Sequence, residues 1–164
     1  MGLTSRLARL FGRERRVAAS PLIDEAAVRR ALAANQRLAQ GRLPAPAMAK
    51  LLKIQHQIVE LLPKAGQFPT GSRDLYVVQR TATDYLPVTL QAYLALPPRF
   101  AATEVVEEGK TAVQVLDEQL DLLAAQLDDI ADAVHRQDSD RLLANGRFLE
   151  ERFGNKSDLA LPNP

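Results

Sequence analysis

An unbroken apolar seam near the C-terminal end constrains this chain more than any other feature. Its members are spaced alternately three and four residues apart: Val113, Leu116, Leu120, Leu123, Leu127, Ile130 and Val134. A heptad spacing sustained over three repeats is typical of helices that pack nearly parallel or antiparallel to one another. Acidic residues lie off the seam. The pattern therefore predicts a long helix that is buried along one side and acidic along the other.

Two helices are predicted before position 70. Ser20 and Pro21 form a favourable start, because serine caps a helix and proline suits its first turn, and Gly41 is a stop signal. The second helix is expected over residues 47–62, where Pro63 ends it. The positions expected to face inward in the second helix are Met48, Leu51, Leu52, Gln55, Ile58, Val59 and Leu62.

A third helical pattern runs from the Ser72 cap to the prolines at positions 97 and 98, and it contains an internal proline. Pro87 lacks an N–H and clashes with the carbonyl four residues back, so it is expected to kink the helix or to start a new one. We expect Tyr85 to lie in the core. The residues that recur at helical spacing around the proline are Tyr85, Leu86, Leu90, Tyr93 and Leu94.

A last helix is predicted after an N-cap at Asp138 or Asp140, ending at Gly154. Strand-like alternation is not recognisable in the sequence. The fold class is therefore all-α, a helical bundle of about five long helices over residues 20–154. Residues 155–164 are expected to form a flexible tail. The apolar residues of the last helix are Leu142, Leu143, Phe148, Leu149 and Phe153.

Residues 1–18 are predicted to form a separate amphipathic helix with a basic face. Such a pattern fits an interfacial helix on an anionic membrane, and it fits equally a helix that docks on protein. The residues expected to make this membrane or partner contact are Leu3, Arg6, Leu7, Arg9, Leu10, Phe11 and Arg13. If the membrane alternative holds, the protein is peripheral at the inner face of the cell membrane.

Composition excludes several classes of function. The chain has no cysteine, so disulfides, zinc–thiolate sites and cysteine nucleophiles are excluded, in keeping with a cytoplasmic protein. An apolar run of the roughly 20 residues that span a bilayer is also missing. The net charge of +1 hides an asymmetry, because residues 1–60 are basic and residues 101–140 are acidic. The two parts can attract each other within the fold, which is the preferred interpretation, or across an oligomer, or they can present two differently charged faces. The small net charge argues against nucleic acid as a partner.

Two short patterns resemble chemical motifs. Asp128, Asp132 and His135 share one helix face and are weak candidates for metal ligands, although helical di-metal sites normally use two carboxylate–histidine elements on facing helices. The alternative is an acidic face that pairs with arginine. Gly109 and Lys110 lack the preceding glycine of a phosphate-binding loop, so a helix entry is the preferred interpretation. The sequence therefore predicts no cofactor and no catalytic residue.

The segment around Pro87 also carries a family resemblance. The runs VVQRTATDYLPVTLQAYLALP, GKTAVQVLDEQLDLLAAQLDDI and LLANGRFLEERFG are similar to a group of actinobacterial-type helical proteins. More distantly, TDYLPVTLQAY resembles the Tyr-Leu-Pro region of the bromo-chloroindolyl phosphate hydrolysis (XpaC-like) family, which is often grouped with toxic-anion resistance proteins. The positions that match this signature, and that can line a docking groove, are Tyr85, Leu86, Pro87, Thr89 and Tyr93.

These observations lead to two alternatives for function. The first is a non-enzymatic helical interaction or scaffold protein, peripheral to the membrane and linked through the resemblance to envelope or toxic-anion stress. Its partner is expected to be another protein or a second copy of the chain, with an anionic membrane surface as a further possibility. The second alternative is a phosphate-ester hydrolase or metal-dependent enzyme of the XpaC-like type.

Overall fold

The computed structural model describes residues 23–154, and most of these residues are helical. The predicted all-α class is confirmed. The elements are α2 (Glu25–Ala39), α3 (Ala45–Leu61), the 3-10 helix η1 (Leu62–Gln67), α4 (Arg73–Arg80), the π-helical turn η2 (Thr81–Tyr85), α5 (Leu86–Leu94), α6 (Pro98–Thr103), β1 (Val105–Glu107), β2 (Lys110–Thr111) and α7 (Ala112–Phe153). The interpretations of residues 1–18 and of the tail lie outside the described residues.

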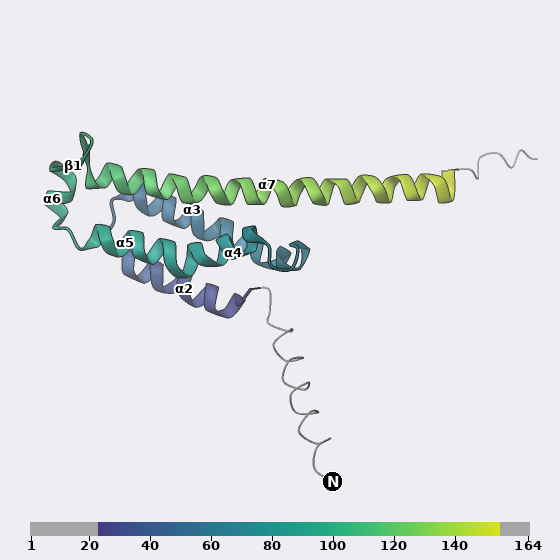
Figure 1. Cartoon of the computed structure of the whole chain (residues 1–164), viewed down its shortest axis with the longest axis horizontal. Helices are drawn as coiled ribbons and strands as arrows, with labels where there is room; N and C mark the ends of the chain where they lie inside the picture. The colour runs from purple at the N-terminus through teal and green to yellow at the C-terminus, as the bar shows by residue number, and fades with distance from the viewer. Residues whose placement is uncertain (1–22, 155–164) are drawn as a thin grey trace, which may run out of the picture.

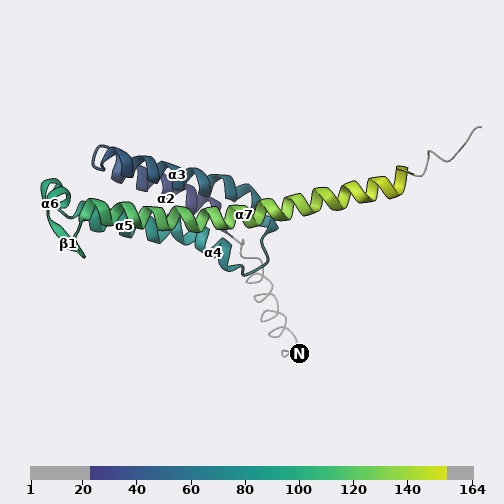
Figure 2. The ribbon, with the colours of Figure 1, turned by 90° about the horizontal axis from the view of Figure 1, so that it is seen from above.

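The helix α7 is the spine of the molecule. It has 42 residues, which gives a length of about 63 Å. Figure 1 and Figure 2 show α3 and α5 alongside its first half, with α2 packed against α3 and α5. Aliphatic side chains from these helices fill one core. Its largest fully buried side chains include Leu51, Ile54, Ile58, Leu86, Leu90, Leu116, Leu120, Leu127 and Ile130.

The predicted seam of α7 is confirmed. Leu116, Leu120, Leu127, Ile130 and Val134 are buried. The two remaining members of the seam, at positions 113 and 123, are half-buried. The heptad spacing thus identifies correctly the side of α7 that faces the other helices.

The prediction of a separate last helix is wrong. The helix α7 continues without a break through Asp138 and Asp140. Both residue types favour helix starts, but no glycine or proline between positions 135 and 145 interrupts the helix. Ser139 adapts to the helix interior, since its hydroxyl donates to the carbonyl of His135 at 3.0 Å. The helix ends at Gly154, as predicted.

The helix α2 starts later than predicted. Ile23 and Asp24 are not helical, and the Asp24 side chain caps the helix by accepting a hydrogen bond from the Ala27 N–H at 2.9 Å. The proposed cap at Ser20 lies outside the described residues. At the other end, the predicted stop at Gly41 is confirmed, because this glycine has φ +72, which is a conformation that favours glycine.

Two inward assignments in α3 are wrong. Leu52 and Val59 are exposed by 44% and 37%, whereas Ile54, Gln57 and Leu61 are buried instead. The helix α3 lies between α2 and α7, so its buried surface is divided between two neighbours. A single apolar stripe read from the sequence cannot capture that division. At its end the chain passes through Pro63 as a 3-10 turn rather than as a loop.

Pro87 is accommodated by a π-helical turn. The helical backbone is continuous from Arg73 to Leu94, and the N–H of Leu86 bonds the carbonyl of Thr81, five residues back. The next bond of that pattern would join position 87 to the carbonyl of Ala82, but proline has no N–H. The side chain of Asn35 in α2 donates to this carbonyl at 2.9 Å, and Asn35 is only 2% exposed. A buried amide therefore replaces the missing backbone donor.

A small hairpin precedes α7, and sequence inspection does not find it. Val105 pairs with Thr111, and the turn residues Glu108 and Gly109 have φ +40 and +80. Two consecutive positive φ values are typical of the tight turns that join antiparallel strands. Strands of two and three residues are too short to show alternation. Thr111 then caps α7, and its side chain and that of Gln114 form a capping box, which confirms the predicted helix entry.

Candidate functional site

The helix α7 divides into two halves with different surroundings. The docked half (residues 112–134) contains all the buried positions of the helix, the last being Val134. The projecting half (residues 135–153) extends beyond the other described helices, as Figure 1 and Figure 2 show from two directions. Only Asp138 and Gly146 within it are half-buried, and its other residues are exposed.

Charge pairs hold the docked half in place. Lys50 of α3 contacts Asp117 at 2.6 Å and Asp121 at 2.7 Å, and Lys53 contacts Asp128 at 3.2 Å. Hydrogen bonds to Asp117 and then Asp121 raise the pKa of Lys50. The predicted attraction between the basic and acidic parts of the chain is therefore present, but lysines of α3 supply it rather than arginines.

A buried amide adds a second tie between α3 and α7. Gln57 is 8% exposed, and its side-chain nitrogen donates to the carbonyl of Ala124 at 3.2 Å and to the carboxylate of Asp128. At the junction of the two halves, Lys64 of η1 donates to Asp138. This hydrogen bond lowers the pKa of the Asp138 carboxyl group. Position 138 is thus the point at which α7 leaves the packed helices.

The projecting half carries apolar side chains that residues 23–154 leave exposed. Leu142 is 71% exposed, Leu143 59%, Phe148 54% and Leu149 43%. Monomeric proteins rarely expose contiguous apolar surface of this kind without a binding role. Sequence inspection identified these residues as members of a helix but did not indicate that they are exposed. The signal that could have separated them is charge, since the projecting half has four arginines and four carboxylates and the docked half has six carboxylates and no basic residue.

The three metal candidates line a polar cavity between α3 and α7. The cavity has a volume of about 380 Å³, and Asp128, Asp132 and His135 contribute to its wall. Asp128 is already engaged by Lys53 and by Gln57. Among residues 23–154, no group of three or more histidine, cysteine, aspartate or glutamate side chains is arranged to hold a metal ion.

Among the described residues that line this cavity, no nucleophile is paired with a base. The hydroxyl of Ser139 lines an adjoining hollow together with His135. Its donor is directed to the His135 carbonyl, so the hydroxyl and the imidazole are not arranged as a nucleophile and its base. Lys110, the lysine of the incomplete phosphate-loop pattern, pairs with Glu118 at 2.8 Å.

The signature residues around Pro87 lie in different environments. Leu86 is fully buried, and burial raises the pKa of the half-buried Tyr93. Tyr85, expected in the core, is 40% exposed. The guanidinium carbon of Arg80 lies 6.0 Å from the centroid of the Tyr85 ring. Pro87 and Thr89 are half-buried. Tyr85 is the last residue of the π turn, and the wider turn places side chains around the helix axis differently from the α-helical spacing on which the prediction rests.

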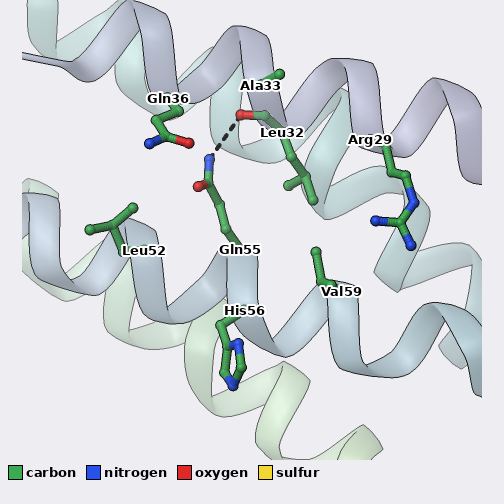
Figure 3. A pocket seen from close by; sticks show the side chains of 8 residues that line it. All are labelled: Arg29, Leu32, Ala33, Gln36, Leu52, Gln55, His56 and Val59. Carbon is green, nitrogen blue, oxygen red and sulfur yellow. Dashed lines mark hydrogen bonds between the residues drawn. The ribbon is translucent and has the colours of Figure 1, made fainter.

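A shallow groove lies between α2 and α3 (Figure 3). It has a volume of about 390 Å³. Across it, the side chain of Gln55 donates to the carbonyl of Leu32 at 2.9 Å. Leu52 and Val59, the two misassigned residues of α3, contribute to its lining. The complete lining is Arg29, Leu32, Ala33, Gln36, Leu52, Gln55, His56 and Val59.

The fold class of the protein is all-α, and its longest described helix, α7, projects beyond the packed helices. Comparison of the chain with protein-family models, curated proteins and solved structures finds no match in any of the three. Within residues 23–154, every helix is too short or too polar to cross a membrane. The predicted contact residues of the N-terminal segment, from Leu3 to Arg13, lie outside the described residues.

Proposed function

We propose that this chain is a helical interaction protein, a bundle that holds a partner along the projecting half of α7. One observation supports the proposal above all: within the described part of the chain, the apolar side chains at positions 142, 143, 148 and 149 are 43–71% exposed. Burying each of them against a partner would stabilise a complex by roughly 1–2 kcal/mol, after allowance for their partial exposure. The docked half offers a partner a mainly acidic surface, on which α3 already pairs the carboxylates of Asp117, Asp121 and Asp128.

Photo-cross-linking in cells that make the protein tests this proposal. A benzophenone amino acid replaces Phe148 in the projecting half and, as a matched control, Leu122 in the docked half. Leu122 is 72% exposed, so the control position is at least as accessible to solvent. We expect covalent adducts from position 148 and few from position 122. Equal labelling from both positions, or none from 148, would contradict the proposal.

The proposal also includes attachment to a membrane surface and a link to envelope or toxic-anion stress, which rest on residues 1–17 and on the family resemblance. A basic amphipathic segment would attach the protein to anionic lipid in a salt-dependent way. Co-sedimentation of the full chain with anionic liposomes should therefore exceed that of a chain lacking residues 1–17. Equal and salt-insensitive partitioning of the two would remove membrane attachment and leave the protein interaction untouched.

A further inference from the structure

We infer that the partner of the projecting half is a second copy of this chain, paired antiparallel with it. The inference rests on the proposed function and names its partner. Four features of the molecule point to this pairing: the apolar face of the projecting half, one glycine within that face, the charge of the projecting half and the reach of the helix.

The apolar face has the spacing of a two-helix seam. Leu142, Gly146 and Leu149 are four and three residues apart, and Phe153 continues the series. A heptad seam has two kinds of position, a and d. In an antiparallel pair, each a residue of one helix lies opposite a d residue of the other. Placing Gly146 of one copy opposite Leu149 of the other brings the reciprocal contact into place by symmetry. One surface then serves both copies, as a two-fold interface requires.

Gly146 is the residue that points to a close neighbour. Glycine inside an exposed helix is less favourable than alanine by about 1 kcal/mol. Among the described residues, no atom lies within 4 Å of the place that a Cβ at Gly146 would take, so packing within the chain does not explain it. A glycine flanked by leucines forms a notch, and a leucine from another helix fits such a notch well.

Charge favours a second copy over other occupants. Residues 135–153 have four arginines and four carboxylates, so two projecting halves do not repel. In the register described, Glu150 lies beside Leu143 of the other copy and Arg152 beside Asn145, so like charges do not meet. A surface without net charge offers little to nucleic acid or to an anionic membrane, whose binding is dominated by basic residues.

The reach of the helix selects the antiparallel direction. The projecting half is about 28 Å long at 1.5 Å per residue. Antiparallel overlap leaves the two packed parts at opposite ends of the contact. Parallel overlap would bring the two packed parts to the same end of the contact, where both would have to fit beside one pair of helices. A contact of this length is small among stable interfaces, which begin near about 1,200 Å², so we expect a dimer that forms with rising concentration.

Light scattering after size-exclusion chromatography tests the inference on the full chain. The mass should rise from 18.0 kDa toward twice that value as concentration increases. Leu149→Glu should weaken association by roughly 30-fold or more, as loss of a central interface residue does. Leu122→Glu, an equally polar change at an exposed site of the docked half, should leave association unchanged. Matching thermal unfolding of both variants in dilute solution would show that neither has lost its fold.

Cysteine cross-linking tests the direction of pairing, because the natural chain has no cysteine to interfere. A mixture of Gly146→Cys and Leu149→Cys chains should form a heterodisulfide faster than either chain forms a disulfide with itself. A faster self-reaction of each variant would indicate parallel pairing and overturn the antiparallel arrangement.

Failure of the inference and failure of the proposed function are distinguishable. A chain that stays monomeric at every concentration, yet cross-links from position 148 to a different protein, overturns the inference and leaves the interaction function standing. Dimerisation that survives Leu149→Glu also overturns it, since another surface would then be responsible. A monomer without adducts at position 148 would overturn both.

Discussion

The two halves of α7 belong to one helix, yet they differ in what stabilises them. The docked half buries a heptad seam against α3 and α5 and pairs its carboxylates with lysines. The projecting half has the same backbone geometry, an apolar face and no net charge, but none of its side chains is fully buried. Tertiary packing thus stabilises the docked half. The projecting half is helical because it continues a helix that is already formed. Apolar periodicity by itself does not tell these two situations apart.

Hydrogen exchange should show the largest difference between the halves. In dilute, monomeric protein, amides of the docked half should exchange only when the whole domain unfolds. Amides of residues 142–149 should exchange at least about 1,000-fold faster, because a helix end without packing opens locally. Mass spectrometry of exchanged peptides measures this ratio. Equal protection in both halves at low concentration would contradict the comparison.

Alanine substitution should give the next largest contrast. Leu127→Ala in the docked half should lower the free energy of unfolding by about 3 kcal/mol, since Leu127 is fully buried. Leu149→Ala in the projecting half should lower it by less than about 0.5 kcal/mol in the monomer. Urea unfolding of the two variants at the same dilution provides the measurement. Similar losses would mean that the projecting half packs against its own chain in solution.

Gly146→Ala should act in opposite directions on the monomer and the dimer. Alanine stabilises the exposed helix locally by about 1 kcal/mol, which hydrogen exchange of neighbouring amides would detect. It also fills the notch, so association should weaken. Asp140→Ala is the matched control, because it improves helix propensity at an exposed position on the opposite side of the helix from the notch. Equal association of the two variants would remove the role given to Gly146.

The smallest effect is expected at the junction of the halves. The pKa of Asp138 is lowered by Lys64, so their pairing stabilises the folded state above pH 3.8, the ordinary value of that carboxyl group. The contribution is lost as the pH falls below 3.8 and through the lowered folded value. Asp138→Asn should therefore lower the melting temperature slightly at neutral pH and not at the acidic end. A constant difference across this range would mean that charge is not the cause.

The sequence indicated the helical class, the seam of α7 and the ends at Gly41 and Gly154, because each depends on local pattern or on one residue type. It did not indicate that α7 is continuous, since Asp138 and Asp140 favour caps and only the surrounding helix decides their conformation. It also failed for Leu52 and Val59, whose burial depends on how two neighbours share α3. The exposed face at residues 142–149 was not foreseen, because an apolar stripe does not reveal whether a partner belongs to the same chain.

The π turn at residues 81–85 has a consequence for the helix that contains it. Leu75 and Val78 before the turn and Leu86 and Leu90 after it are all buried. A π-helical turn contains about one residue more than an α-helical turn, so it takes up an extra residue with little net rotation of the segments on either side. Deleting one amino acid within the turn should therefore restore α-helical spacing and keep both pairs on the buried side, whereas a deletion elsewhere between the pairs would rotate one pair away from the other by about 100°. The π turn is thus the place where this helix can change length with the least effect on its packing.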